Sequence, residues 1–352
     1  MIKAELFEKG IHNQVICRLC AHQCHLNDGA VGICRVRKNI AGTLYSLNSD
    51  RVVAMHMDPV EKKPLYHFLP GSSTFSVAAM GCNFSCRFCQ NYSISMVNEE
   101  RGIVGETISP EQLIKNALKN RAHSIAYTYT EPTIFFELML ETARLAQQAG
   151  IKNVMVSNGY ISSQALSRLR PFLDAANIDL KAFNDDFYNK YCSARLQPVL
   201  ETISAMKTMG IWLEITTLLI PGLNDNDEEI KRLISFLLQV DDSMPWHIAR
   251  FFPQYKLQHI PLTAQGSIHK FLRLGAAMGL KYLYGGNLTV AAWHDTHCPR
   301  CKKKLIQRLG YQTEIVALQF GKCQFCDQDI PGVWENMPSL EIHSSSSPLT
   351  KK

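Results

Sequence analysis

The stretch FSVAAMGCNFSCRFCQN, residues 75–91, decides how the rest of this chain is interpreted. Its first six residues form a mostly apolar run that ends at a glycine, which is typical of a buried β-strand. Three cysteines follow at C-x3-C-x2-C spacing, namely Cys82, Cys86 and Cys89. Three thiolates hold three irons of a cubane cluster, and the missing fourth protein ligand leaves one iron open for a substrate or cofactor. We therefore predict a reactive [4Fe-4S] site on the loop after this strand.

Strand-like runs alternate with amphipathic helical patterns from residue 74 to residue 290. After the first run we expect strands at 124–129, 153–158, 176–181, 212–220, 246–252 and 282–284. We expect helices at 162–173, 227–239 and 266–278, and two more that end near Gly150 and at Gly210. Repeated βα units imply a parallel sheet. Because a cysteine loop and not a glycine-rich dinucleotide fingerprint follows the first strand, we predict an α/β fold of the partial (βα)6 TIM-type barrel class.

Cysteine-rich segments flank this predicted barrel on both sides. We predict an N-terminal cysteine-rich module and connector at 1–73, the barrel at 74–290, a zinc-ribbon-like module at 291–335 and a flexible tail at 336–352. Hydrophobic residues make up 46% of the chain and charged residues 19%, which is ordinary for a soluble protein with a large core.

Charge and hydropathy narrow the expected partners and compartment. The net charge of +6 is a weak argument for an acidic partner, and the densest basic run, 302–304, is typical of a solvated face, so nucleic acid is not the expected partner. The N-terminus lacks the apolar core of a signal peptide, and no segment approaches the ~18 apolar residues of a membrane helix. We therefore expect a cytoplasmic protein without a membrane contact. Because a reducing compartment disfavours disulfides, we expect the twelve cysteines to serve in metal ligation or redox function.

The last cysteine group has the spacing of two knuckles that close on one tetrahedral ion. Its pattern is C-x2-C, a gap of 21 residues, then C-x2-C, formed by Cys298, Cys301, Cys323 and Cys326. Four thiolates leave no open coordination position, so a structural zinc is predicted, with rubredoxin-like iron as the alternative.

The first cysteine group has the less regular pattern C-x2-C-x3-C-x9-C, formed by Cys17, Cys20, Cys24 and Cys34. Four thiolates in eighteen residues need a metal to order them, and zinc or a second iron–sulfur cluster would serve equally well. His22 or His25 could replace one cysteine as a metal ligand, although a surface position without a ligand role is the more ordinary interpretation of both histidines. Cys192 stands alone and is expected to be a small buried hydrophobe on a helix.

Polar residues at the predicted strand ends are the candidate ligands of a cofactor, because reactive groups gather at the carboxyl ends of parallel strands. Glu131, just before a proline, could receive an ammonium group or act as a helix N-terminal carboxylate. Ser157 and Asn158 could bind a ligand or only make a turn. Asp179 and Lys181 alternate along one strand and share a face, either as a buried ion pair or facing a polar cavity.

These motifs resemble the radical S-adenosylmethionine superfamily, in which a three-cysteine loop follows the first barrel strand. The segments YTYTEP (127–132), DLK (179–181) and LIPGLND (219–225) resemble the branch of the pyruvate formate-lyase activating enzymes. The flanking cysteine patterns and the ending IPGVW (330–334) are similar to the AmmeMemoRadiSam-system radical enzymes. The resemblance spans residues 17–334.

The resemblance implies that Cys82, Cys86 and Cys89 ligate a [4Fe-4S] cluster that chelates S-adenosylmethionine. It further implies that Glu131 contacts the amino group of this cofactor and that Lys181, in an Asp-x-Lys motif, lies near its carboxylate. The family usually has two glycines before this glutamate, and Tyr129 and Thr130 stand in their place.

Activating enzymes also place a histidine near the sixth strand, where this chain reads RFFPQY (250–255). His247 is a weak substitute, and Arg250 and Tyr255 are the other polar residues near that strand.

The implied reaction is reductive cleavage of S-adenosylmethionine to methionine and a 5′-deoxyadenosyl radical, which abstracts hydrogen from a substrate. An external electron donor such as flavodoxin or ferredoxin is expected, and the substrate is expected to be a protein or another macromolecule, with glycyl-radical activation as the sharper version. The alternatives are a radical enzyme that modifies RNA and a non-enzymatic iron–sulfur and zinc protein that transfers electrons or binds a partner.

Overall fold

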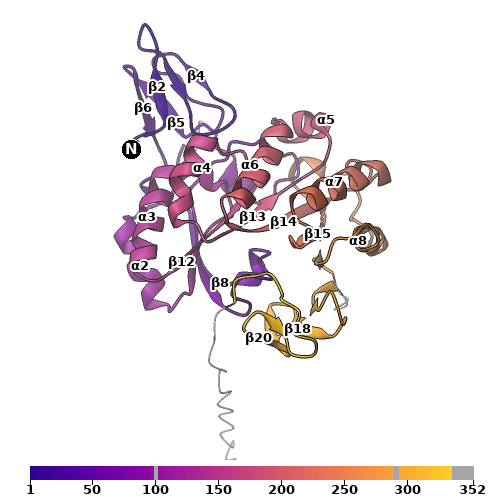
Figure 1. The fold of residues 1–352 in the computed structure, drawn as a ribbon. Coiled ribbons are helices and arrows are strands. Elements are labelled where there is room, and N and C mark those ends of the chain that lie inside the picture. Colours follow the sequence, from indigo (N-terminus) through magenta and orange to yellow (C-terminus); the bar gives the residue numbers. More distant parts are fainter. Residues whose placement is uncertain (99–101, 289–292, 335–352) are drawn as a thin grey trace, which may run out of the picture.

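A central mixed sheet of eight strands organises the computed structural model, which describes residues 1–98, 102–288 and 293–334 (Figure 1). The strand order is β16-β15-β14-β13-β12-β11-β9-β8. The bounds are β8 Ala54–Pro59, β9 Ser73–Ala78, β11 Ser124–Tyr127, β12 Lys152–Ser157, β13 Ala175–Asp179, β14 Trp212–Leu219, β15 Trp246–Arg250 and β16 Leu283–Gly286. In this sheet, β9 and β11 to β16 pair in parallel, and β8 pairs with β9 in the antiparallel sense.

Helices follow the parallel strands along the chain. The α-helices are α1 Tyr92–Ser95, α2 Pro110–Lys119, α3 Phe136–Gln148, α4 Ser163–Leu169, α5 Asp185–Phe187, α6 Gln197–Thr208, α7 Asp227–Val240 and α8 Gln265–Met278. Shorter turns are η1 Val60–Lys62, η2 Pro132–Phe135, η3 Arg170–Phe172, the π-helical η4 Tyr188–Cys192 and η5 Tyr255–Leu257. Local sequence starts the longer helices: Ser109 and Gln112 form a capping box at α2, and the Asn226 side chain caps α7.

The predicted α/β class and the predicted order of strands are confirmed, with most element ends shifted by a few residues. The edge strand β8 was not predicted, and its antiparallel pairing makes the sheet mixed. No helix in the described ranges is long and apolar enough to cross a membrane.

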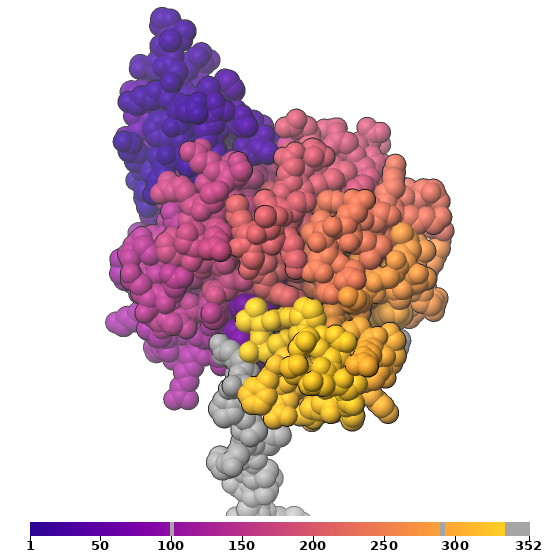
Figure 2. All heavy atoms as spheres, in the orientation of Figure 1, coloured from indigo at the N-terminus to yellow at the C-terminus, as the bar shows by residue number. Residues whose placement is uncertain are grey.

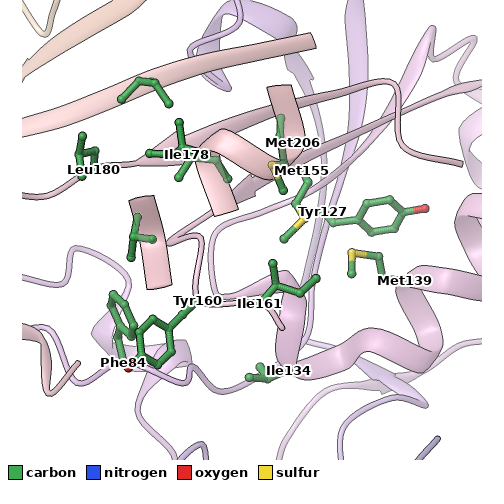
Figure 3. Packing of buried hydrophobic residues seen from close by; sticks show 14 of the residues in the cluster. Phe84, Tyr127, Ile134, Met139, Met155, Tyr160, Ile161, Ile178, Leu180 and Met206 are labelled. Atoms are coloured by element: carbon green, nitrogen blue, oxygen red, sulfur yellow. The ribbon is translucent and has the colours of Figure 1, made fainter. Parts of the chain in front are cut away.

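The hydrophobic core lies between the sheet and its helices. Figure 3 shows Tyr127 and Met155, which are partners in the register of β11 and β12, beside Met139 of α3 and Met206 of α6. All four side chains are at most 1% exposed. The Tyr127 hydroxyl donates to the Asn153 Oδ1 atom over 3.0 Å, so the one polar atom of this ring is satisfied.

The connector between β8 and β9 covers part of the other face of the sheet. Ala126 and Val154 point away from the main core and pack with Leu65 and Phe68 of this connector in a separate apolar cluster. Burial of both faces explains why these parallel strands are almost continuously apolar.

Small sheets precede and follow the central one. The N-terminal strands are β1 Ile2–Lys3, β2 Phe7–Lys9, β3 Val15–Cys17, β4 His25–Leu26, β5 Arg37–Ile40, β6 Thr43–Ser46 and β7 Arg51–Val52, which pairs with β10 Glu106–Thr107. The C-terminal strands are β17 Thr296–His297, β18 Lys304–Leu309, β19 Gln312–Ile315, β20 Leu318–Gln319 and β21 Lys322–Cys323. The two segments occupy opposite ends of the molecule (Figures 1 and 2).

A directed chain of hydrogen bonds ties the C-terminal segment to the sheet. Arg308 Nη1 donates to Thr296 Oγ1 over 2.9 Å, and the Thr296 hydroxyl lies 2.8 Å from the Tyr284 hydroxyl of β16. The Tyr284 hydroxyl lies 2.6 Å from His67 Nε2, and His67 Nδ1 lies 2.8 Å from the Pro331 carbonyl. Because a carbonyl only accepts, His67 donates from Nδ1 and accepts at Nε2, which makes it a neutral imidazole. Each donor along this chain of contacts therefore meets an acceptor.

Candidate functional site

The three-cysteine loop leaves the carboxyl end of β9 through a glycine that no other residue could replace easily. Gly81 has φ +113°, and a Cβ atom placed there would lie 2.8 Å from Val36 Cγ1. After it the chain presents Cys82, Cys86 and Cys89, of which Cys86 is buried and the other two are half-buried. The predicted cluster ligands therefore lie on one loop at the end of the sheet where reactive groups are expected.

The π-helical turn η4 holds this loop from the other side. Ser85 N donates to the Cys192 carbonyl over 2.9 Å, and Arg87 N donates to the Tyr191 carbonyl over 2.9 Å. Cys192 is fully buried, as expected, but its thiol hydrogen-bonds to Cys86. No local pattern pointed to this contact, since the two cysteines lie 106 positions apart in the chain.

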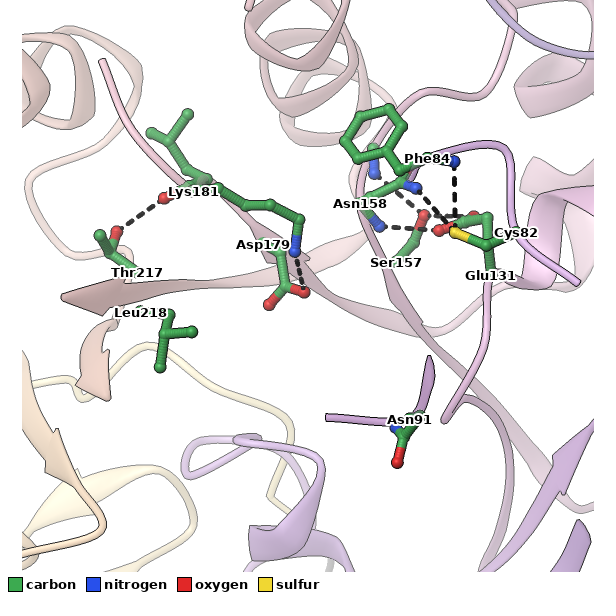
Figure 4. A network of polar contacts seen from close by, with 12 residues as sticks. Cys82, Phe84, Asn91, Glu131, Ser157, Asn158, Asp179, Lys181, Thr217 and Leu218 are labelled. Carbon is green, nitrogen blue, oxygen red and sulfur yellow. Dashed lines mark hydrogen bonds and ion pairs between the residues drawn. The ribbon is translucent and has the colours of Figure 1, made fainter. Parts of the chain in front are cut away.

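Glu131 lies at the centre of a buried polar network beside Cys82 (Figure 4). Its Oε1 atom accepts from Thr133 N at 3.0 Å, from Thr133 Oγ1 at 2.6 Å and from Ser157 Oγ at 2.8 Å. Its Oε2 atom accepts from Asn158 N at 2.9 Å. The carboxylate caps η2, as in the helix-terminus interpretation, yet Oε2 has a lone pair to spare for a further donor. Burial raises the pKa of Glu131, although the four donors oppose that shift.

Asn158 connects this network to the cysteine loop. Its Nδ2 atom donates to Asn83 Oδ1 over 2.8 Å and lies 3.9 Å from Cys82 Sγ, while its Oδ1 atom accepts from Tyr160 N. The turn interpretation of Asn158 is thus confirmed, and the same residue contacts the loop. Asn83 was missed by the sequence reasoning, although its place directly after the first cysteine could have drawn attention to it.

Asp179 and Lys181 form an ion pair, one of the two arrangements predicted from their alternation. Lys181 Nζ lies 2.9 Å from Asp179 Oδ2, and the two side chains are 13% and 37% exposed. Figure 4 shows the pair pointing to one side at the end of β13, and Lys181 Nζ also lies 5.8 Å from the centre of the Phe88 ring in the cysteine loop. Burial lowers the pKa of Lys181, but the Asp179 carboxylate and the Cys86 sulfur outweigh this and raise it. Lys181 therefore stays protonated beside the loop.

Tyr129 occupies the place of a family glycine and adopts a glycine-like backbone, with φ +65°. Its carbonyl accepts from Asn91 Nδ2 over 2.7 Å, which ties it to the end of the cysteine loop. The Tyr129 hydroxyl donates to Asp58 of β8, and Lys63 Nζ lies 4.5 Å from the centre of the tyrosine ring. These side-chain contacts hold a left-handed conformation that costs a non-glycine residue about 1 kcal/mol or more.

The three residues near the sixth strand separate in the structure. His247 is the second residue of β15, where its Nε2 atom is 2.7 Å from Glu214 Oε2. Arg250, at the carboxyl end, donates from Nε to the Thr263 carbonyl over 2.6 Å. The Tyr255 ring stacks on Tyr92, just after the cysteine loop, at 4.6 Å between centroids. His247 is thus paired with Glu214, whereas Tyr255 contacts a residue that follows the cysteine loop.

The C-terminal cysteine group has the geometry of a site for one metal ion. The sulfur atoms of Cys298, Cys301, Cys323 and Cys326 all lie within 4.8 Å of one another. The Cys298–Cys326 and Cys301–Cys323 sulfur distances are both 3.6 Å. Tetrahedral zinc with Zn–S bonds of about 2.3 Å requires sulfur atoms about 3.8 Å apart, so the four residues fit such an ion.

The N-terminal cysteine group lines one small cavity. The walls are Cys17, Cys20, Cys24, Cys34, Arg37 and Ile134, together with His22 and neighbouring backbone. His22 Nε2 lies 2.8 Å from the Asn83 carbonyl, whereas His25 is exposed on β4. The surface interpretation therefore holds for His25, and His22 contacts the cysteine loop.

Comparisons with known proteins agree with this arrangement. The family model described as the radical SAM superfamily matches residues 77–237. An uncharacterized protein of Methanocaldococcus jannaschii is 39% identical over 94% of this chain and 99% of its own length. A protein of the same organism named as a glycyl-radical enzyme activating enzyme is 27% identical over 51% of this chain and 68% of its own.

More distant relatives carry related names. The pyruvate formate-lyase-activating enzyme of Clostridium pasteurianum is 21% identical over 51% of this chain and 76% of its own. A radical SAM methyltransferase of Sphaerobacter thermophilus has a solved structure that covers 62% of this chain and 67% of its own at 17% identity, with a TM-score of 0.49. Residues 77–237 thus form a radical SAM domain, and the chain has relatives that are named as activating enzymes.

Proposed function

We propose that this chain is a radical enzyme that cleaves S-adenosylmethionine reductively and abstracts hydrogen from a protein or other macromolecular substrate. The observation that carries the proposal is the contact of Cys82 with the buried Asn158–Glu131 network, with Lys181 beside the same loop. The cysteine loop would hold the metal cluster, and the flanking strand ends would hold the amino and carboxylate groups of S-adenosylmethionine.

Cys82, Cys86 and Cys89 fit a [4Fe-4S] cluster by number and by spacing. Their sulfur atoms are not all within 4.8 Å of one another, unlike those of the C-terminal group, and this suits thiolates that bind different irons. When bound, the cluster and S-adenosylmethionine supply the one-electron cleavage that yields methionine and a 5′-deoxyadenosyl radical. We propose that the parallel strands curve as a partial barrel around this site.

We assign the cofactor-binding roles to the residues at the strand ends. Glu131 Oε2 would accept a hydrogen bond from the amino group of S-adenosylmethionine, and Lys181 would face its carboxylate. Ser157 and Asn158 would hold the Glu131 carboxylate in place, because they donate to its two oxygens. Asp179 would hold the Lys181 ammonium group through the 2.9 Å ion pair.

The partners follow from the reaction. An external one-electron donor of the flavodoxin or ferredoxin kind would reduce the cluster, and a backbone glycine Cα of a partner enzyme is the sharper candidate for the hydrogen donor. The names of the activating-enzyme relatives support this choice. We place the reaction in the cytoplasm, where a reducing medium would keep the twelve free cysteines available for metals.

We also propose that the C-terminal cysteine group holds a structural zinc. Four thiolates close the coordination sphere, so this ion would stabilise the C-terminal segment and would not react.

Anaerobic reconstitution with iron, sulfide, dithionite and S-adenosylmethionine tests the enzymatic proposal. We expect methionine and 5′-deoxyadenosine in equal amounts, and neither from a variant with Cys82→Ala, Cys86→Ala and Cys89→Ala. If the wild-type protein makes neither product and S-adenosylmethionine leaves the paramagnetic resonance spectrum of its cluster unchanged, the chain is not such an enzyme.

A further inference from the structure

The N-terminal cysteine group encloses a small cavity. The cavity has a volume of about 10 Å³, room for about one water-sized sphere, and four cysteine sulfurs share its wall. Gly32 lies beside two of them, where a Cβ atom would be in ordinary van der Waals contact, 3.6 Å from Cys24 Sγ and 3.8 Å from Cys34 Sγ.

The spread of the sulfur atoms separates this group from the C-terminal one. In the part of the chain that the structure describes, the C-terminal cysteines form the one group of three or more potential ligands with all ligand atoms within 4.8 Å. No three of the N-terminal sulfurs meet that limit, although all four line one cavity. A single zinc ion would draw four sulfurs to about 3.8 Å from one another. Thiolates that bind four different irons of a cubane lie farther apart.

A buried arginine with free donors faces the same cavity. Arg37 is 1% exposed and donates from Nη2 to both carboxylate oxygens of Glu137, at 2.8 and 2.7 Å. Its Nε and Nη1 atoms are buried and have no protein partner. An unpaired buried donor destabilises the folded chain unless a ligand accepts from it. The sulfurs of an anionic iron–sulfur cluster are such acceptors, and hydrogen bonds to them tune the cluster potential.

From the sulfur spread and the free donors of Arg37, we infer that Cys17, Cys20, Cys24 and Cys34 hold a second [4Fe-4S] cluster. This cluster has four protein ligands, so no iron is open and it does not bind S-adenosylmethionine.

The second site lies directly against the first. His22 Nε2 is 2.8 Å from the carbonyl of Asn83, the residue after Cys82. Ile134 lines the cavity, and its Cδ1 atom would lie 3.3 Å from a Cβ atom on Gly81. The two cysteine groups therefore share one wall of protein, which suits two redox centres that exchange electrons.

Metal analysis of two proteins tests the inference without any activity measurement. Both are purified anaerobically from cells supplied with iron and zinc and are then reconstituted with ferrous iron and sulfide. One is the wild-type chain, and the other carries Cys82→Ala, Cys86→Ala and Cys89→Ala, which removes the reactive site and leaves the N-terminal group intact.

We expect about eight irons and eight sulfides per wild-type chain and about four of each in the triple variant, with one zinc in both. Adding Cys17→Ala and Cys20→Ala to the triple variant should remove the remaining iron. If the triple variant holds two zinc ions and no iron, or iron without sulfide, the inference is wrong. This holds whether or not the wild-type protein cleaves S-adenosylmethionine, and the triple variant decides even if the quintuple variant fails to fold.

Discussion

Glu131→Gln is the substitution that most directly tests how the candidate site is built. The Glu131 side chain is 1% exposed and accepts four hydrogen bonds, three at Oε1 and one at Oε2. Glutamine has the same shape but carries an NH₂ group in place of one oxygen. In the less harmful orientation this group takes the Oε2 position and faces the N–H of Asn158, donor against donor.

The expected loss of stability follows from these contacts. One hydrogen bond to a charged acceptor, about 1.5–3 kcal/mol, disappears, and the Asn158 N–H is left buried without an acceptor, at about 1–3 kcal/mol. A neutral side chain recovers part of this sum, because it no longer has to be buried as an anion, the effect that raises the pKa of Glu131. We expect a net decrease of about 2 kcal/mol in the free energy of unfolding, which a chain of this size survives.

Urea unfolding of the anaerobic protein measures this change, and calorimetric titration measures the affinity for S-adenosylmethionine. The matched control is Glu141→Gln, whose side chain is 44% exposed and pairs with Arg144 on the surface of α3. We expect the control to change stability by less than about 0.5 kcal/mol.

The two readouts separate the two roles of Glu131. A stability change as small as that of the control would refute the four-bond account of the site. An unchanged affinity for S-adenosylmethionine in a destabilised variant would leave Glu131 as a helix cap alone. If Glu131 receives the amino group of the cofactor, the affinity should fall at least tenfold, about 1.4 kcal/mol.

Three further predictions concern other parts of the chain. Burial lowers the pKa of His67 to about 4, so the unfolded chain binds more protons than the folded chain below pH 6.5. In urea unfolding, the free energy of unfolding should therefore decrease by about 3 kcal/mol as the pH falls from 6.5 to 4. His67→Gln should lose this pH dependence, and a variant with the same pH dependence as the wild type would contradict the neutral-imidazole assignment. Cys192→Ala removes the thiol that hydrogen-bonds to Cys86 and should lower the midpoint potential of the reactive cluster by about 50 mV in a spectroscopic titration. Cys192→Ser should keep the potential near the wild-type value. Equal potentials in all three proteins would show that the Cys192 contact does not affect the cluster. A chelator that extracts one zinc per chain should lower the melting temperature, and an unchanged melting temperature would mean that the C-terminal metal is not structural.

The parallel strands were predictable because both faces of each are buried, which leaves apolar runs such as that at β12. Strand β8 was not predictable, because its sequence AMHMDP has no strand pattern and the strand forms through pairing with β9. The N-terminal strands of two to four residues are too short for any period to be recognised.

In the candidate site, the residues at strand ends were predictable, since the topology of a parallel sheet brings these ends together. Glu131, Asp179 and Lys181 were found in this way. The contact of Cys192 with Cys86 and the left-handed backbone of Tyr129 depend on tertiary packing, to which no local pattern points.

The chain of hydrogen bonds from Arg308 to Pro331 has a consequence for how the whole protein responds to its surroundings. It joins the C-terminal cysteine segment to β16 and to the connector that covers the sheet. A metal that binds only the folded form stabilises it by mass action, by about 2.7 kcal/mol when free metal exceeds its dissociation constant a hundredfold. Through these bonds, zinc that occupied the proposed C-terminal site would also stabilise the central sheet against unfolding.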